Sequence, residues 1–274
     1  MVATFFDKCY TYCQVMNMKI TVLTENTSHC GLPAEHGISF YIETGAHKLL
    51  FDTGQSALFA ANAAALGVDL RAVDTAVLSH GHYDHGGGLK TFLALNDHAP
   101  VYLSQYAFEP HWRGAEKDIG LEDSLRTSDR LRFCGEETAI ADGLTLYAKN
   151  GAEKAVDLGS FGLMMKRGGA LVPDDFRHEH YLLIEENGRC ALISGCSHKG
   201  ILNIVRWFAP DVLVGGFHFS KLPLDGRLES YARQLAGYDT DYYTCHCTGV
   251  EQYRYMKQFM PNLHYLSTGD VLDC

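Results

Sequence analysis

The feature that most constrains this 274-residue chain is a run of three histidines and one aspartate within six residues, His80-Gly81-His82-Tyr83-Asp84-His85. An apolar run over 75–78 precedes it, and three glycines follow it over 86–88. Histidines two residues apart can turn the same way at the end of an extended strand, so His80 and His82 can bind one ion. Asp84 and His85 then fall where a turn could direct them at a second ion. The spacing therefore predicts a one- or two-metal site.

Composition narrows the class of protein and of partner. The chain is 46% hydrophobic and 20% charged, which is ordinary for a globular protein, and its length allows one large domain or two small ones. Its formal net charge of −10 disfavours a nucleic-acid partner. No apolar run reaches the roughly 18 residues that a membrane span needs. We expect a small-molecule substrate, with neither nucleic acid nor membrane as partner, and the oligomeric state stays open.

The nine cysteines show no regular framework, and the start of the chain has no apolar signal-peptide core. Reduced cysteines in a cytoplasmic protein are the simplest interpretation. Residues 1–17 look detached from the strand that begins after Met18, so we interpret 1–17 as an extension and 18–274 as one domain. The alternative is a genuine N-terminal segment with a Cys9/Cys13 pair.

Hydrophobic periodicity predicts paired strands followed by strand–helix alternation, and it does so in both halves of the chain. In the first half, strands are expected at 19–24, 38–43, 48–51, 75–78 and 101–104, with helices at 56–66 and 88–95. In the second half, strands are expected at 162–166, 181–185, 190–194, 211–214 and 263–266, with helices at 199–208, 227–235 and 250–259. The repetition suggests two similar halves packed face to face. Residues 105–160 lack strong periodicity, with short strands expected near 131–134 and 144–148, and are the expected place for a variable insertion with substrate-specific loops or a cap.

Several predicted strands end in polar groups suited to chemistry, and active sites on layered sheets are usually built beyond strand ends. These ends are Phe51-Asp52-Thr53-Gly54, Ser79-His80, Gly195-Cys196-Ser197-His198, Gly216-Phe217-His218 and Thr244-Cys245-His246. Their convergence on one edge would make a cleft lined with His, Asp and Cys.

These motifs carry a resemblance. The His80-x-His82-x-Asp84-His85 run, with Asp52 on the preceding strand, resembles the metallo-β-lactamase-fold superfamily of metallohydrolases. The signatures Ala34-Glu35-His36-Gly37, Ser194-Gly195-Cys196-Ser197-His198, Gly215-Gly216-Phe217-His218 and His246-Cys247-Thr248-Gly249 look like one branch of it. That branch is labelled after 7,8-dihydropterin-6-yl-methyl-4-(β-D-ribofuranosyl)aminobenzene-5′-phosphate synthase.

The resemblance implies an α+β fold, a four-layer αββα sandwich, with a one- or two-metal site. It assigns His80 and His82 to the first metal, Asp84 and His85 to the second, and Asp52 to the groups that orient the ligands. We expect His198 at the first metal and His246 at the second, with Cys196 as a further candidate ligand in place of the usual bridging aspartate. His218 is expected to bind a substrate phosphate or transfer a proton, although it competes with His246 for the second metal.

Imidazole and carboxylate ligands suit Zn²⁺ first, with Fe²⁺ and Mn²⁺ as alternatives. We therefore expect an enzyme, a hydrolase or a pterin-type transferase, acting on a small phosphorylated or pyrophosphorylated substrate, with Asp84 also orienting the nucleophile. The alternative is a metal-binding redox or sensor protein that uses Cys196 and Cys245-His246-Cys247.

Overall fold

Two seven-stranded sheets face each other in the computed structural model, which describes residues 16–274. In the first sheet the strand order is β18-β1-β2-β3-β4-β5-β8, and in the second it is β17-β16-β15-β14-β13-β10-β9. The first sheet comprises β1 (Lys19–Thr24), β2 (Ser39–Glu43), β3 (Lys48–Phe51), β4 (Thr75–Val77), β5 (Val101–Ser104), β8 (Leu131–Cys134) and β18 (Val271–Asp273). The second comprises β9 (Glu137–Ala141), β10 (Leu144–Tyr147), β13 (Tyr181–Glu186), β14 (Arg189–Ser194), β15 (Val212–Val214), β16 (Asp241–Thr244) and β17 (Leu263–Tyr265).

The two sheets share one topology. β1, β2 and β3 pair antiparallel, and β4, β5 and β8 then add in parallel. β10, β13 and β14 likewise pair antiparallel, and β15, β16 and β17 add in parallel. The expectation of two similar halves is therefore confirmed.

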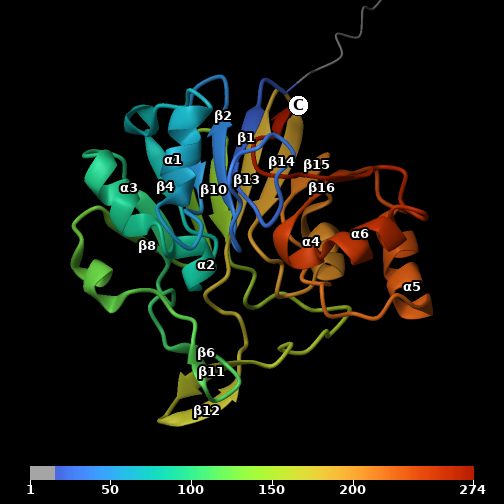
Figure 1. Cartoon of the computed structure of the whole chain (residues 1–274). Helices are drawn as coiled ribbons and strands as arrows, with labels where there is room; N and C mark the ends of the chain where they lie inside the picture. Colours follow the sequence, from blue (N-terminus) through green and yellow to red (C-terminus); the bar gives the residue numbers. More distant parts are fainter. Residues whose placement is uncertain (1–15) are drawn as a thin grey trace, which may run out of the picture.

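Helices cover the outer faces of both sheets (Figure 1). On the first sheet lie α1 (Leu58–Ala65), the short α2 (Tyr83–Gly86) and α3 (Leu89–Leu95), with the 3₁₀ turn η1 (Leu70–Ala72). On the second lie α4 (Ile201–Phe208), α5 (Gly226–Leu235) and α6 (Val250–Met256), while η2 (Asp123–Thr127) and η3 (His246–Thr248) are single 3₁₀ turns. This arrangement is the predicted αββα sandwich.

Three apolar cores hold the layers together. The central core lies between the sheets and includes Ile20, Phe40, Leu146 and Ile193. A second core under α1 and α3 includes Phe59 and Phe92, and a third under α4, α5 and α6 includes Ile204 and Leu228. Alternate strand residues point to opposite faces, so each sheet contributes side chains to the central core and to the core under its own helices.

The stretch 105–160 is built differently from the expected insertion. It contributes β8 to the first sheet and β9 and β10 to the second, because these strands continue the two sheets at their edges. Only β6 (His111–Arg113) and β7 (Lys117–Asp118) join a separate four-stranded sheet, with β11 (Leu163–Arg167) and β12 (Ala170–Pro173) from beyond residue 160. This third sheet projects from the strand-end edge of the sandwich (Figure 1).

The predicted N-terminal extension, residues 1–17, can be compared with the structure only at its last two residues, Met16 and Asn17. Met16 is buried in the central core, and the backbone amide of Asn17 donates to Glu186 Oε2 at 2.7 Å. The predicted extension therefore includes at least one residue that packs with the domain. Residues 1–15, with Cys9 and Cys13, lie outside the described part. Within residues 16–274, no helix is long and apolar enough to cross a membrane, and the cytoplasmic location stays a prediction.

Candidate metal centre

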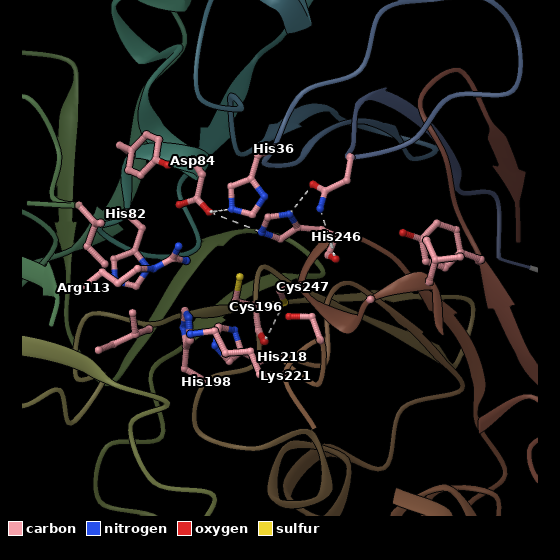
Figure 2. A pocket seen from close by; sticks show the side chains of 18 residues that line it. His36, His82, Asp84, Arg113, Cys196, His198, His218, Lys221, His246 and Cys247 are labelled. Carbon is pink, nitrogen blue, oxygen red and sulfur yellow. Dashed lines mark hydrogen bonds and ion pairs between the residues drawn. The ribbon is translucent and has the colours of Figure 1, made fainter. Parts of the chain in front are cut away.

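The predicted strand ends meet in one cavity at the edge where both sheets finish (Figure 2). β4 leads to His80, His82 and Asp84, while β14, β15 and β16 lead to Cys196-Ser197-His198, His218 and His246. Side chains more than a hundred residues apart therefore line the same space. The cavity residues that bear on the chemistry are His36, His82, Asp84, Arg113, Cys196, His198, His218, Lys221, His246 and Cys247.

Sharp turns place these side chains. Four non-glycine residues at the strand ends adopt the left-handed backbone region, with φ of 57° at Asp52, 57° at Ser197, 57° at His218 and 49° at His246. Such conformations cost about 1–3 kcal/mol each and persist only where the surroundings hold them. Their recurrence at four strand ends indicates that the turns serve the site rather than the sheets.

The first group of candidate ligands comprises His80, His82 and His198, whose ligand atoms lie within 4.8 Å of one another. The Nε2 atoms of His80 and His82 are buried without a hydrogen-bond partner. A buried imidazole nitrogen without a partner is unfavourable unless something else binds it. The orphaned Nε2 of His80 is what a cation would satisfy, so the donor set fits a metal ion of the Zn²⁺ type.

Asp52 fixes which nitrogen of two histidines is free. The Ser79 hydroxyl donates to Asp52 Oδ2 at 2.7 Å and therefore accepts from His80 Nδ1, 2.8 Å away. Asp52 Oδ2 also accepts from His85 Nδ1 at 2.7 Å. With both Nδ1 atoms carrying the proton, the Nε2 atoms of His80 and His85 are bare lone pairs, which is the form a metal requires.

Glu179 and Asn26 hold the Nδ1 protons of His198 and His246 in a similar way. Glu179 Oε1 accepts from His198 Nδ1 at 3.0 Å and from the His198 backbone amide at 2.7 Å. Asn26 Oδ1 accepts from His246 Nδ1 at 2.8 Å. His80, His85, His198 and His246 thus each have the Nδ1 proton held by a neighbouring oxygen, so the Nε2 of each is available to an ion.

The second group comprises His36, Asp84 and His246. Asp84 Oδ2 lies 3.2 Å from His36 Nε2 and 3.6 Å from His246 Nε2, and His85 Nε2 approaches the same oxygen at 4.0 Å. Although its burial raises the pKa of Asp84, the facing His85 and His246 lower it, and the pKa lies well below its usual range. Burial lowers the pKa of His80 and His82 well below the usual value. The site therefore offers an ionised carboxylate, with neutral imidazoles at His80 and His82.

Comparison with known proteins agrees with this geometry. The family model described as the metallo-beta-lactamase superfamily matches residues 33–232. The chain belongs to this superfamily.

Several similar proteins align with almost the whole of this chain. A Methanocaldococcus jannaschii protein described as uncharacterized is 28% identical over 92% of this chain and 99% of its own length. The 7,8-dihydropterin-6-methyl-4-(beta-D-ribofuranosyl)-aminobenzene-5'-phosphate synthase of the same organism is 26% identical over 94% of this chain and 97% of its own length. The crystal structure of Tm1679, a metal-dependent hydrolase of the beta-lactamase superfamily, superposes with a TM-score of 0.79 at 29% identity, covering 94% of this chain and 99% of that one. The resemblance to the branch named after the synthase is therefore confirmed.

The superfamily typically binds divalent metals, and here buried His and Asp clusters stand where metals can bind. The structure brings all six histidine and aspartate ligand candidates into this region. His80, His82 and His198 share the first group, as expected, and Asp84 and His246 share the second. His85 lies between the groups, because its Nε2 faces both Asp84 Oδ2 and the Cys196 Sγ, 3.2 Å away.

The cysteine motif of the alternative function divides in the structure. Cys196 and Cys247 lie with His218, their ligand atoms within 4.8 Å of one another. Cys245 instead points into the central core and is fully buried among apolar side chains, where burial raises its pKa well above the ordinary value. The idea that Cys245 and Cys247 act together is wrong, because the chain leaves β16 after Thr244 and turns sharply at His246, with φ of 49°, into η3, so that Cys247 lines the cavity while Cys245 stays in the central core.

His218 lies beside the first group rather than the second. Its ring is 4.5 Å from that of His198 and 4.5 Å from Phe161, and its Nδ1 is buried without a hydrogen-bond partner. It therefore does not compete with His246 for Asp84.

The sequence patterns predicted no role for several residues that lie near the site. His36 and Asn26 lie far upstream of the histidine run and reach the site through loops. Glu179 precedes β13 in a Arg177-His178-Glu179-His180 run, a cluster of titratable residues before a buried strand that could have flagged it. His111, Asp174 and His178 form a further buried group beside His82.

Proposed function

We propose that this protein is a metal-dependent enzyme that hydrolyses, or transfers a group from, a small phosphorylated or pyrophosphorylated substrate. The observation that carries the proposal is the lining of the cavity. The two candidate metal groups open into the same space as Arg113 and Lys221, two exposed cations on a chain of net charge −10. Cations placed against an otherwise acidic protein favour an anionic group at that position.

The rest of the lining supports a substrate with an apolar or aromatic body. Tyr83, Ile119, Leu163, Val250 and Tyr265 border the cavity. Arg113 and Ile119 belong to the third sheet and its loop, while Lys221 follows His218 on the opposite side. A phosphoryl group held between Arg113 and Lys221 would bring its linkage to Asp84 and the histidines.

Zinc is the proposed ion, since His80, His82 and His198 supply three imidazoles and Asp84, His85 and His246 supply the mixed second set. When bound, such ions lower the pKa of a water molecule toward about 7 and polarise a phosphoryl oxygen. Asp84 orients the attacking group through its second oxygen, and Asp52 and Glu179 keep the ligand rings in place. His218 is the proposed proton donor to the leaving group, because its unpartnered Nδ1 lies at the cavity wall.

Hydrolysis and transfer differ only in the attacking nucleophile. The similarity to a synthase of M. jannaschii supports transfer, and the similarity to a structure described as a metal-dependent hydrolase supports hydrolysis. A cytoplasmic location and a small-molecule partner belong to this proposal.

The test combines metal analysis with turnover. Purified protein should contain a transition metal by mass spectrometry and should hydrolyse bis(p-nitrophenyl) phosphate or inorganic pyrophosphate. Chelation should abolish turnover, and Zn²⁺ or Mn²⁺ should restore it. His82→Ala should lose most of the activity, whereas the exposed His98→Ala should keep it. Metal-free protein, together with unchanged turnover in His82→Ala, would refute the proposal.

The second candidate function, a redox or sensor protein, rests on the Cys196–His218–Cys247 group. Burial raises the pKa of Cys247, but Cys196 and His218 lower it, and the pKa lies well below the ordinary value. Anaerobic reconstitution with Fe²⁺ should then give visible absorption that Cys247→Ser removes. Absence of visible absorption would contradict the redox or sensor function and leave the metal-dependent enzyme as the one remaining proposal.

A further inference from the structure

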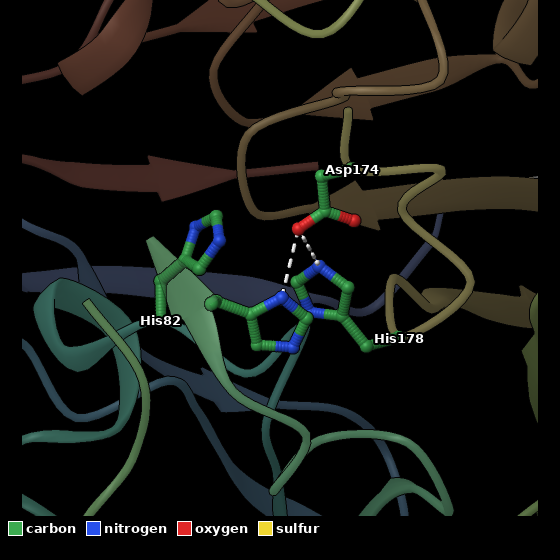
Figure 3. Close-up of side chains that lie close together, drawn as sticks. His82, Asp174 and His178 are labelled. Atoms are coloured by element: carbon green, nitrogen blue, oxygen red, sulfur yellow. Dashed lines mark hydrogen bonds and ion pairs between the residues drawn. The ribbon is translucent and has the colours of Figure 1, made fainter. Parts of the chain in front are cut away.

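A buried histidine–aspartate cluster outside the ligand groups adjoins the metal centre (Figure 3). His111 lies on β6, Asp174 follows β12, and His178 precedes β13. The side chains of all three are fully buried. Asp174 Oδ2 accepts from His111 Nδ1 at 2.8 Å and faces His178 Nε2 at 3.5 Å, while Asp174 Oδ1 accepts from the Phe176 amide at 2.8 Å.

His82, a candidate ligand of the first metal, borders this cluster. One of its ring nitrogens lies within 4.8 Å of an Asp174 carboxylate oxygen. Its ring is 5.1 Å from that of His178 and 5.5 Å from that of His111. Its Nε2 is buried without a hydrogen-bond partner. Figure 3 shows the His82 ring turned toward the Asp174 and His178 pair.

A third metal ion among these four residues conflicts with one hydrogen bond. The Gly81 backbone amide donates to His178 Nδ1 at 2.9 Å. His178 Nδ1 is therefore an acceptor, and its proton sits on Nε2, facing Asp174. A protonated Nε2 cannot bind a metal.

The carboxylate instead has unused positions. A carboxylate offers about four lone-pair positions, and the His111 ring and the Phe176 amide use two of them, while His178 Nε2 approaches Oδ2 at 3.5 Å without a hydrogen bond. The His111 and His178 contacts offset the effect of burial, which raises the pKa of Asp174, and leave that pKa well below its usual range. A fully buried carboxylate therefore lies within 4.8 Å of a ring nitrogen of His82, whose Nε2 lacks a partner.

We propose that Asp174 is a positioning residue that accepts the ring N–H of His82 when the other nitrogen of His82 binds the metal. Carboxylates commonly hold metal-binding histidines in this way, fixing the tautomer and raising the basicity of the ligand. The third sheet is then part of the metal centre, because β6 and the loop after β12 supply the residues that orient His82. This inference rests on the proposed metal-dependent function.

A double-mutant cycle on zinc affinity tests it. Zinc dissociation constants would be measured by competition with a chromophoric chelator for the wild type, Asp174→Asn, His82→Ala and the double variant. Asp174→Asn should weaken zinc binding about 10- to 100-fold in the wild type. In the His82→Ala background, the same change should alter the affinity of the remaining zinc less than about threefold, because the ligand that Asp174 holds is gone.

Two further variants separate positioning from folding and from a third ion. His178→Gln can still accept from the Gly81 amide through its side-chain oxygen, so it should bind zinc in the same amount as the wild type and within about threefold in affinity. Asp97→Asn, in an exposed Asp–His pair with a 3.1 Å contact, is the matched surface control. Far-UV circular dichroism of the metal-free variants would verify folding.

The outcomes are distinct. Equal weakening by Asp174→Asn in both backgrounds, or wild-type affinity in Asp174→Asn, overturns the inference while leaving the proposed function intact. Loss of one zinc equivalent in His178→Gln overturns it in favour of a third ion. Wild-type protein that binds no transition metal overturns the proposed function and the inference together.

Discussion

Asp52 Oδ2 lies 2.7 Å from His85 Nδ1, and both side chains are fully buried. The same carboxylate accepts from the Ser79 hydroxyl, which in turn holds His80 Nδ1. One aspartate on the end of β3 thus sets the tautomers of two candidate ligands that lie in neighbouring groups. Its left-handed backbone, with φ of 57°, keeps the carboxylate aimed between them.

Asp52→Asn is therefore expected to weaken zinc binding about 10- to 100-fold, because an amide NH₂ cannot accept from His85 and Ser79 as the carboxylate does. Equilibrium dialysis against buffered zinc would measure the change. Asp69→Asn, in an exposed pair with Arg71, is the control and should bind zinc like the wild type. An affinity for Asp52→Asn within twofold of the wild type would contradict the role of Asp52.

Gly195→Ala should disrupt the metal centre through steric overlap with Ser79. A Cβ at Gly195 would lie 2.2 Å from Ser79 Oγ and 3.1 Å from His80 Nδ1, so Ser79 must move and the Asp52–Ser79–His80 chain breaks. We expect a loss of about 1–3 kcal/mol in the free energy of unfolding, measured with urea, together with weaker zinc binding. Gly151→Ala, where a Cβ meets nothing within 4 Å, should change neither quantity. Equal behaviour of the two variants would count against this contact.

Arg113→Ala and Lys221→Ala should each raise KM for a phosphorylated substrate about tenfold, with a smaller effect on kcat, because a charge-assisted hydrogen bond to the bound anion is lost. Steady-state kinetics at two ionic strengths would measure both constants, and the difference from the wild type should shrink at high salt. Arg132→Ala, an exposed arginine on β8, is the control for general charge loss. Unchanged KM in both cavity variants would remove the support for an anionic substrate.

Stability should fall in weak acid. Burial lowers the pKa of His180 to about 4, and its Nε2 donates to the Gly135 carbonyl at 2.8 Å. A histidine with a depressed pKa takes up its proton more readily in the unfolded chain, whose value is about 6.5. Its contribution is therefore complete above about pH 6.5 and is lost as the pH falls toward 4, by up to about 1.4 kcal/mol per pH unit.

His180→Gln should show a shallower decline over that window when urea unfolding of metal-free protein is followed from pH 7 to pH 4.5. His85 acts in the opposite sense, since Asp52 and Asp84 outweigh its burial and raise its pKa, so the slopes are compared between variant and wild type. His29→Gln, at an exposed position, is the matched control. Parallel slopes for all three proteins would exclude His180 as a source of the acid sensitivity.

Local patterns sufficed for much of the fold. The helices expected at 56–66 and 199–208 are present as α1 and α4. The first is rich in alanine and is followed by Gly67, whereas the second has apolar residues at helical spacing and is followed by Pro210. The run around His80 predicted the site because several ligands sit on one turn. The equivalent second-half residues were found because strand ends at one sheet edge converge.

The remaining parts depend on pairings between distant segments. The short strands β8, β9 and β10 carry weak periodicity, yet they complete the two main sheets by hydrogen bonding to strands already formed. His36, Asn26 and Asp174 reach the centre through loops, and their roles follow from which ring nitrogen they face. The turn at His246 after β16 leaves Cys245 in the core and places Cys247 in the site, a distinction that the Cys-His-Cys motif alone did not resolve.

The candidate ligands divide between the two sheets: His80, His82, Asp84 and His85 follow β4, whereas His198 and His246 follow β14 and β16. Neither half of the sandwich supplies all of the candidate ligands. A bound ion would link the two halves and would stabilise only the assembled domain, by about 2.7 kcal/mol when the free metal concentration is a hundredfold above its Kd. Metal occupancy would then report that both halves are folded and joined, so that loading and assembly become a single event.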